Sequence, residues 1–369
     1  MSGLASHAHT LIIGAGLSGL HAAHLLEQRG AGDYTLLEGR DRPGGRILSA
    51  NSYDLGPAWL WPEVQPELAA LVGDLGLSLE PQHETGLMMV ERSGAPLRMP
   101  SYASYPASMR VAGGMETLTD ALRARLDPAR IRLNQTVTRL HAVGDGIEAH
   151  TRDPHGRVSV HRASRILLAV PPRLAQASID FDPPLPAALA AQWRDTPTWM
   201  APHAKYVAIY ATPFWREQGL SGEARSGQGP MAEIHDAGTR QGPALFGFLG
   251  VPAAARLSAG KEILMAHCRA QLARLFGPQA LTPVREYFKD WAQDPHTATQ
   301  ADGIAGGAHA AAPAMSADTG PWQGRVAGIA SEWSAAFPGY LAGAADAAGR
   351  GVQWLLQAPP AYPPGNFVP

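Results

Sequence analysis

The fold is decided by residues 10–19, TLIIGAGLSG, together with two short stretches that follow them, LLE at 36–38 and RPGGR at 42–46. The apolar run at 11–13 is typical of a buried parallel strand, and the glycines follow it directly. Leucines recur along one side of the next segment, which predicts a helix. A second strand is predicted at 34–37, so the chain opens as strand, glycine turn, helix and strand.

Each part of this opening has a task in binding a dinucleotide. Gly14 allows a tight turn, Gly16 lets a pyrophosphate approach the backbone, and Gly19 lets the helix pack on the strand. The free N–H groups at the helix start would face the phosphates. Glu38 stands where a carboxylate binds ribose hydroxyls, which argues against a cofactor with a ribose 2′-phosphate. A lone GxGxxG is usually a surface turn, but with strand, helix and acid in place the sequence predicts a dinucleotide site.

Bulk composition narrows the class of protein. The 369 residues suffice for two lobes, and 45% hydrophobic and 17% charged residues are ordinary globular values. Thirty basic and 32 acidic side chains give a net charge of −2, so no nucleic-acid partner is expected. The only cysteine is Cys268, and the fourteen histidines form no recognisable ligand motif, so we expect no metal site. No leader or membrane span is recognisable, and we expect a soluble, cytoplasmic protein.

The segments predicted to build the nucleotide-binding domain occur in three separate blocks of the sequence. We predict a nucleotide-binding domain from residues 1–83, 113–172 and 301–357, a substrate domain from 84–112 and 173–300, and a Pro-rich tail at 358–369. The predicted elements are a helix at 116–126, strands at 131–133, 137–141, 165–170 and 326–330, and a small-residue helix at 340–356. In the substrate domain, residues 205–210 alternate like a half-buried strand.

These motifs, taken in order, resemble the flavin-containing amine oxidase family, the monoamine oxidase-like flavoproteins. The resemblance is carried by the residues already quoted and by further motifs along nearly the whole chain: DLGPAW at 54–59, GGM at 113–115, LAVPP at 168–172, PFW at 213–215, GIASE at 328–332 and GYLAGA at 339–344. It implies an α/β fold: a Rossmann-like FAD-binding lobe built from discontinuous segments and an α+β substrate lobe with a mixed or antiparallel sheet.

The resemblance also implies FAD and the residues that hold it. The pyrophosphate would lie on Gly14, Gly16, Ser18 and Gly19, and the ribose on Glu38. Further predicted cofactor contacts run from the adenosine to the flavin: Val137, Arg40, Gly45, Arg46, Glu332, Gly56, Pro57, Ala58, Trp59 and Leu341. Leu341 would sit at a helix start whose dipole stabilises the reduced flavin anion. Other roles are open for some of them, because the arginines suit a solvated face, Val137 a strand core and Glu332 a helix cap.

Three residues are candidates for the reacting end. Seven residues separate Lys205 from Pro213, and the family lysine that holds a water near flavin N5 precedes its own Pro-Phe-Trp similarly. Tyr340 matches a family tyrosine over the flavin face, and Trp291 begins a segment that resembles the one leading to the flavin. The structural alternatives are a lysine extending from a strand end and two aromatic rings packed in the core.

Three departures from the family pattern bear on the substrate. Gln300 or Ala301 falls where a second cage tyrosine is common, so the aromatic cage looks incomplete. No cysteine stands in the segment that carries a covalent flavin, so the FAD should be noncovalent. Only residues 84–112 fill the place of a long helical insertion. We therefore predict a short roof, with an open cavity, a bulky substrate or a roof from another subunit.

The leading hypothesis is an FAD-dependent amine oxidase or dehydrogenase that transfers a hydride from the substrate α-carbon to flavin N5. The acceptor that reoxidises the flavin would be O2, giving H2O2, or another molecule. A second hypothesis keeps the fold and makes the protein a desaturase or oxidase of a hydrophobic isoprenoid or porphyrinogen. A third makes it a flavin-binding interaction protein without turnover. An oligomer is possible.

Overall fold

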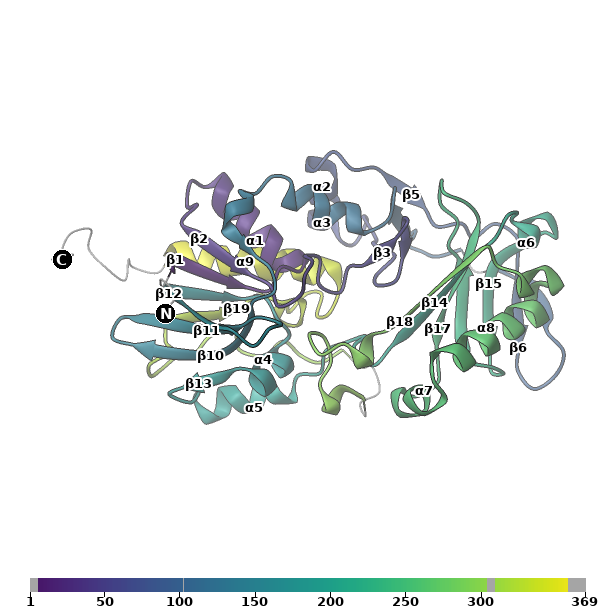
Figure 1. Cartoon of the computed structure of the whole chain (residues 1–369). Coiled ribbons are helices and arrows are strands. Elements are labelled where there is room, and N and C mark those ends of the chain that lie inside the picture. Colours follow the sequence, from purple (N-terminus) through teal and green to yellow (C-terminus); the bar gives the residue numbers. More distant parts are fainter. Residues whose placement is uncertain (1–5, 102, 304–308, 358–369) are drawn as a thin grey trace. The chain divides into compact units, whose positions relative to one another are not determined.

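The computed structural model describes residues 6–101, 103–303 and 309–357. The chain packs into two compact units, each built from separate stretches of sequence (Figure 1). The first unit comprises the residues up to Gly45, Leu122–Thr198 and the residues from His309 onward. The second unit comprises Arg46–Ala121 and the residues from Trp199 up to 303.

The first unit is organised around an eight-stranded sheet. Its central strands are parallel: β1 lies between β12 and β2, β9 pairs with β2, and β19 pairs with β12. An antiparallel extension, β12–β11–β10, ends in β13, which runs parallel to β10. The strands are β1 Ser6–Ile13, β2 Tyr34–Leu37, β9 Ile131–Arg132, β10 Thr136–Val143, β11 Gly146–Arg152, β12 Val158–Leu168, β13 Asp180–Asp182 and β19 Val326–Gly328.

Helices of this unit come from both ends of the sequence. Helix α1 (Leu17–Gln28) packs on α9 (Leu341–Gln357), and Figure 1 shows the purple and yellow ribbons lying together over the strands. Two prolines end the β12 segment, and the second begins α4 (Pro172–Ser178), which packs on α5 (Ala187–Asp195). Short 3₁₀ turns lie at η1 Pro128–Arg130 and η5 Ser331–Trp333.

The second unit is organised around a seven-stranded sheet in the order β18–β14–β17–β16–β15–β6–β7. All neighbours are antiparallel except β15 and β6, so the sheet is mixed. Its strands are β6 Leu87–Glu91, β7 Leu97–Pro100, β14 Ala204–Ile209, β15 Leu220–Ser226, β16 Met231–Asp236, β17 Ala244–Leu249 and β18 Arg285–Asp290. Residues 84–112, the predicted short roof, thus supply β6 and β7 to this sheet.

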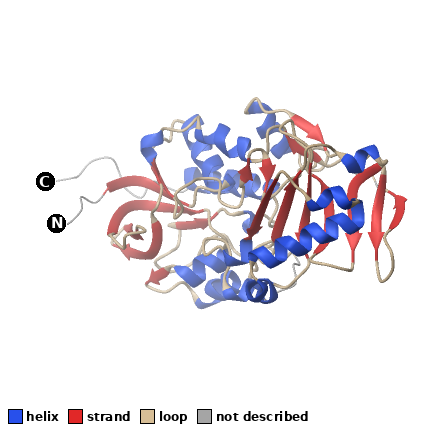
Figure 2. Ribbon diagram, turned by 45° about the vertical axis from the view of Figure 1, so that its right-hand side comes forward, coloured by secondary structure: helices blue, strands red, loops and turns tan. Residues whose placement is uncertain are grey.

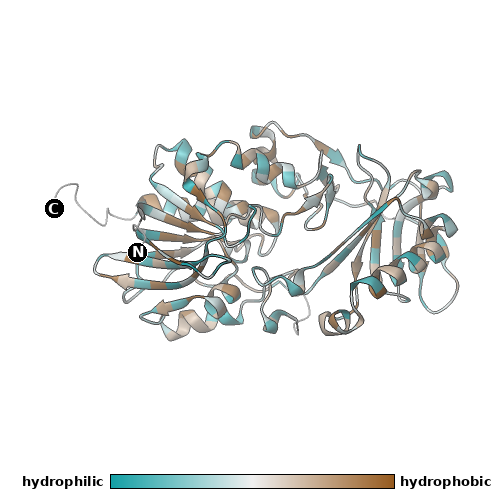
Figure 3. Cartoon of the chain, viewed as in Figure 1, coloured by the Kyte–Doolittle hydropathy of each residue, from teal (hydrophilic) through white to brown (hydrophobic). Residues whose placement is uncertain are grey.

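Helix α8 (Lys261–Phe276) lies across the strands of this sheet (Figure 2). Its buried residues include Leu264, Cys268 and Leu272, which follow one another at four-residue spacing and pack into the core. Figure 3 shows that apolar residues recur along the strands of both sheets, as the cores require. The remaining elements are two small antiparallel sheets of two strands each, β3 Ser49–Ala50 with β4 Tyr53–Asp54 and β5 Leu79–Pro81 with β8 Met109–Val111. There are also the helices α2 Pro66–Asp74, α6 Phe214–Glu217 and α7 Ala253–Ala259, and the 3₁₀ turns η2 Pro278–Leu281, η3 Trp291–Gln293 and η4 Gln300–Gly303.

The prediction that residues 205–210 form a half-buried strand is wrong in one respect. All six residues of β14 are buried. Strand β14 lies between β17 and β18, and both of its faces are covered: Ala204, Tyr206 and Ala208 join one apolar cluster, and Val207 and Ile209 join another. Residue alternation reports which face a side chain takes, and it cannot report that both faces are covered.

The two units divide the sequence differently from the predicted domains. Residues 46–83 and most of α3 (Glu116–Arg123) pack with the second unit, and residues 173–198 pack with the first. Which residues bind cofactor and which bind substrate is a separate question from compactness, so the domain assignment stays a prediction. The predicted tail at 358–369 lies outside the described residues. In the part of the chain that is described, no helix is long and apolar enough to cross a membrane.

Candidate active site

The glycine turn after β1 leaves no room for side chains. Gly14 has a φ of +103°, and a Cβ there would lie 2.9 Å from the carbonyl oxygen of Ala169. A Cβ on Gly19 would lie 1.9 Å from the carbonyl oxygen of Gly14, which no rearrangement of a side chain relieves. Gly14 is therefore required by the turn, and Gly19 by the close packing of α1 on β1.

A second glycine turn lies against the first. The N–H of Gly44 donates to the carbonyl of Ala15 at 2.8 Å. Gly45 has a φ of +58°, and a Cβ there would come within 3.1 Å of the Cα of Gly16. Gly16 starts α1, and no side chain caps that helix end. The two turns therefore present bare backbone beside the uncapped start of a twelve-residue helix, which suits a phosphate.

Glu38 lies buried at the end of β2, next to this backbone. Its carboxylate accepts the N–H of Ala15 at 2.8 Å and the N–H of Arg40 at 2.9 Å, and the Arg40 guanidinium is 3.6 Å away. These contacts fix the carboxylate beside the glycine turn, as a group that binds ribose hydroxyls requires. The side chain of Val137 packs in the core of the unit, so a contact with adenine would come from its backbone.

The C-terminal motif meets the N-terminal turn. The Ser18 hydroxyl donates to the carbonyl of Ile329, although the two residues are 311 positions apart. The buried carboxylate of Glu332 accepts the Ser331 hydroxyl at 3.1 Å. Leu341, half-buried, begins α9 nine residues after Glu332. The structure thus brings Ser18 and Glu332 into one neighbourhood within the first unit.

Tyr340 has an aromatic neighbour that sequence reasoning missed. The ring of His309 stacks on it, with ring centroids 4.8 Å apart and an interplanar angle of 17°. His309 Nδ1 lies 2.7 Å from the carbonyl oxygen of Pro338. Gln300 and Ala301, the two positions considered for a second cage residue, lie in η4 of the second unit. A histidine in an alanine-rich stretch offers no spacing signal, so the sequence does not mark it as a neighbour of Tyr340.

In the second unit, two predicted catalytic residues converge on one loop. The Lys205 Nζ donates to the carbonyl of Gly56 at 3.1 Å, and the Trp291 indole N–H donates to the carbonyl of Leu55 at 2.9 Å. Pro57 and Ala58 continue this loop. A Cβ on Gly56 would lie 2.1 Å from the carbonyl oxygen of Arg46, so the loop also depends on a glycine and contacts the Arg46 backbone.

Trp59 closes this group on one side. Its indole N–H donates to Gln82 Oε1 at 2.8 Å, and its ring lies edge-on to His235 at 4.8 Å. The Phe246 ring is 5.5 Å from Trp59 and lies under the Lys205 ammonium, with Nζ 3.9 Å from the ring centroid. Phe248, the cross-strand neighbour of Lys205, contributes a second ring at 5.4 Å. The lysine head therefore sits among aromatic rings.

Burial has the largest effect on the protonation state of Lys205. The side chain is 2% exposed, and burial lowers its pKa to about 7, with Asp54 opposing the shift and Arg110 adding to it. An ordinary lysine is almost fully charged at neutral pH, whereas this one is divided between ammonium and amine. Such a group can hold or exchange a proton near neutrality.

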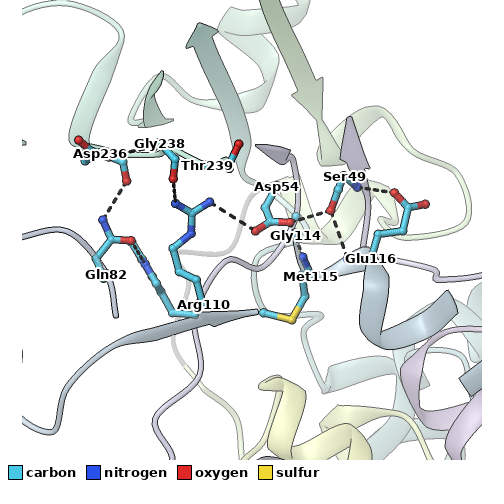
Figure 4. Close-up of polar contacts among 12 residues, drawn as sticks. Ser49, Asp54, Gln82, Arg110, Gly114, Met115, Glu116, Asp236, Gly238 and Thr239 are labelled. Atoms are coloured by element: carbon cyan, nitrogen blue, oxygen red, sulfur yellow. Dashed lines mark hydrogen bonds and ion pairs between the residues drawn. The ribbon is translucent and has the colours of Figure 1, made fainter. Parts of the chain in front are cut away.

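Asp54 and Arg110 belong to a chain of polar contacts that sequence reasoning also missed (Figure 4). Asp54 belongs to the DLGPAW motif, whereas no motif includes Arg110. The carboxylate of Asp54 accepts the Ser49 hydroxyl at 2.6 Å and the N–H of Met115 at 2.7 Å, and burial raises its pKa. An arginine three positions before the first of two consecutive glycines, Gly113 and Gly114, was the available signal.

Replacement of Lys205 by methionine should change how stability depends on pH. The folded-state pKa is about 7 and the unfolded value about 10.4, so between these values the unfolded state binds one more proton. The contribution of Lys205 to the free energy of unfolding therefore rises with pH across this window, by about 1.4 kcal/mol per unit. We expect denaturant unfolding to show that the free energy of unfolding of K205M, relative to that of wild type, is higher at pH 7 than at pH 10. An equal difference at both values would contradict the lowered pKa.

The residues of the first unit fit a dinucleotide. Bare glycine backbone, an uncapped helix start and a buried carboxylate at the next strand end supply the donors for phosphates and the acceptor for ribose. The second unit holds Lys205, Trp291 and the 56–59 loop together. The only cysteine, Cys268, is buried in α8. Among the described residues, no group of three or more histidine, cysteine or acidic side chains is arranged to hold a metal ion.

Comparison with known proteins gives a consistent picture. The family described as "Flavin containing amine oxidoreductase" matches residues 84–355, and the "NAD(P)-binding Rossmann-like domain" matches residues 12–75. The putrescine oxidase of Kocuria rosea is 24% identical over 87% of this chain and 90% of its own. A putrescine oxidase variant from a redesign of cofactor binding has the same fold, with a TM-score of 0.79, 21% identity, and coverage of 96% of this chain and 99% of the variant. The cyclohexylamine oxidase of Brevibacterium oxydans has a TM-score of 0.77 at 19% identity, with coverage of 94% of this chain and 98% of its own.

Proposed function

Since the chain belongs to the flavin-containing amine oxidoreductase family, we propose that it oxidises an amine at the carbon beside the nitrogen, with Lys205 at the reacting end. The family and the α/β fold class predicted from the sequence are confirmed. The protein is an FAD-dependent oxidoreductase of the amine oxidase type. The substrate, the electron acceptor and the role of each residue belong to the proposal.

The first unit would bind the FAD. Gly14, Gly16 and Gly19 would face the pyrophosphate, Glu38 the ribose, and Glu332 the ribityl side. This assignment is supported by the bare backbone of the two glycine turns and by the hydrogen bonds that fix the Glu38 carboxylate. Cys268 packs in the apolar core of the second unit, which supports a noncovalent cofactor.

The reaction removes a hydride from the carbon and a proton from the nitrogen, and water hydrolyses the imine that results. Bound FAD would supply the hydride acceptor and would pass two electrons to O2 or to another acceptor. The amine of Lys205 would hold a water by donating to it or accepting from it. The rings of Phe246, Phe248 and Trp59 would exclude other water from the lysine head, which keeps its neutral form populated.

The observation that carries the proposal is a lysine buried among aromatic rings on β14, an interior strand of the sheet in the second unit. Burying an ammonium in such a place costs free energy of folding, so a lysine at this position favours a functional role over a purely structural one. Trp291 and Lys205 both hold the 55–56 backbone, which supports a shared role in shaping the reacting end.

Anaerobic mixing with a panel of amines tests the proposal. The panel contains putrescine, cyclohexylamine, benzylamine and a secondary amine, and loss of the 450 nm flavin absorbance is followed by stopped flow. At least one amine should bleach the flavin at a rate no slower than the steady-state turnover measured with that amine. Readmitted O2 or a quinone should then restore the colour. Bleaching by a polyene or porphyrinogen alone would favour the desaturase hypothesis. A flavin that no donor reduces would favour the interaction protein.

A further inference from the structure

Asp54 is a buried carboxylate whose two oxygens have different surroundings. Oδ1 accepts hydrogen bonds from the Ser49 hydroxyl and the Met115 N–H. Oδ2 is buried, and in the described part of the chain it has no hydrogen-bond partner. Asp54 directly precedes Leu55 and Gly56, whose carbonyls accept from Trp291 and Lys205. This carboxylate is therefore the acidic group that belongs to the loop under the lysine head.

Arg110 is the cation that faces Oδ2. Its guanidinium lies 3.9 Å from that oxygen and donates at 3.0 Å to the carbonyl of Gly238, as Figure 4 shows. The side chain is 11% exposed and is carried by β8, where its cross-strand neighbour on β5 is Glu80. The Gly238 carbonyl fixes the guanidinium, so Arg110 faces Asp54 at a distance that gives charge compensation without a direct hydrogen bond.

Charge counting shows what this arrangement does. Ionised Asp54 and Arg110 sum to zero, so the buried cluster is neutral when Lys205 is an amine and carries a net positive charge when Lys205 is an ammonium. We propose that Arg110 is a positioning residue for Lys205: it holds the Asp54 carboxylate as its own counterion and so leaves the lysine head without one. Lys205 is thereby kept in the form that can accept a hydrogen bond.

The other charged groups around Lys205 are already paired. Lys289, its cross-strand neighbour on β18, contacts Asp294 at 2.8 Å and lies over the Trp291 ring. On β16, Glu233 contacts both His235 at 2.6 Å and Arg225. These groups compensate one another, so Asp54 and Arg110 remain the charged pair that adjusts the pKa of Lys205, on top of the lowering that burial causes.

The sequence permits a direct measurement, because it contains only three lysines, Lys205, Lys261 and Lys289. The holoenzyme is labelled with ¹³Cε-lysine and titrated by NMR, and K261R and K289R assign the signals. In wild type one signal should titrate near pH 7. In Arg110→Gln the pKa of Lys205 should rise by about 1 unit, a tenfold change in the ammonium-to-amine ratio. In Asp54→Asn it should fall.

Opposite shifts in the two variants are the signature of the proposal, because a general loosening of the site would move both in the same direction. Arg240→Gln is the matched control: this arginine, 85% exposed and paired with Glu80, should leave the Lys205 signal unchanged. A pKa that stays or falls in Arg110→Gln would overturn the proposal. If that variant loses its FAD, Arg110→Met and the Asp54→Asn/Arg110→Gln pair supply the same comparison, and the pair should lie between its parents.

The kinetic consequence rests on the proposed function, whereas the NMR readout does not. The pH profile of flavin reduction by a reactive amine should shift in the same direction as the Lys205 pKa in each variant. Shifted signals with an unshifted profile would sink the role of Lys205 in the reaction and leave the role of Arg110 intact. Unshifted signals would sink the role of Arg110, whatever the kinetics.

Discussion

Replacing Lys205 by methionine is expected to slow reduction or reoxidation of the bound flavin by about 100-fold or more, the usual contribution of a positioned proton-transfer group. FAD content should stay that of wild type, because the groups proposed to hold the pyrophosphate and the ribose belong to the first unit, and Lys205 gives the 55–56 loop only one hydrogen bond, to the Gly56 carbonyl. Methionine fills a similar volume without the amine. Anaerobic stopped flow measures the reductive half-reaction, and mixing the reduced enzyme with O2 measures the oxidative one.

Lys261→Met is the matched control for that experiment. Lys261 is the exposed first residue of α8, so the same chemical change there removes a charge without touching a buried site. Its two half-reactions should keep wild-type rates. If K205M also keeps both rates, Lys205 has no part in the reaction, and the buried lysine is then a structural tie to the Gly56 carbonyl.

Gly19→Ala is expected to abolish FAD binding. A Cβ at this position would lie 1.9 Å from the carbonyl oxygen of Gly14, and backbone on both sides offers no flexible group that could yield. The helix would have to move away from β1, which displaces the turn that faces the phosphates. Purified G19A should be colourless, and added FAD should not raise its melting temperature, whereas the stability of wild type should rise with the logarithm of the free FAD concentration once this exceeds Kd.

Gly349→Ala shows whether that loss is specific. Gly349 lies within α9, and a Cβ there would meet nothing within 4 Å. Alanine is the better helix former by roughly 0.5–1 kcal/mol, so this variant should bind FAD normally and melt slightly higher. Yellow G19A protein with wild-type affinity would show that α1 packs differently from the arrangement described.

Local sequence pattern predicts the N-terminal elements of the first unit well. The apolar run, the glycines and Glu38 predicted β1, α1 and β2, with the bounds of β2 as observed. Sequence spacing works there because each residue has a conformational task that few others meet: Gly14 needs a positive φ, and Gly19 needs the absence of a Cβ. The pairing of Ser18 with Ile329 lay beyond any local signal.

The second unit was harder to foresee, because its key features come from packing. The burial of both faces of β14 depends on residues far away in sequence. For this reason the strand that carries Lys205 is fully buried, whereas the sequence predicts a half-buried strand. Arg110 matters through a 3.9 Å contact with Asp54, 56 positions earlier. His309 stacks on Tyr340 across a stretch with no motif. Such contacts follow from topology, which one sequence does not specify.

The central position of β1 has a consequence for synthesis on the ribosome. β1 pairs with β12, and the Ser18 contact requires Ile329, so the nucleotide-binding half cannot close until nearly the last helix has emerged. The first forty residues must wait while some three hundred others are made. We expect such long-range closure to make folding slow and sensitive to truncation. Nascent chains arrested before β19 should therefore retain no yellow colour, however much FAD is supplied.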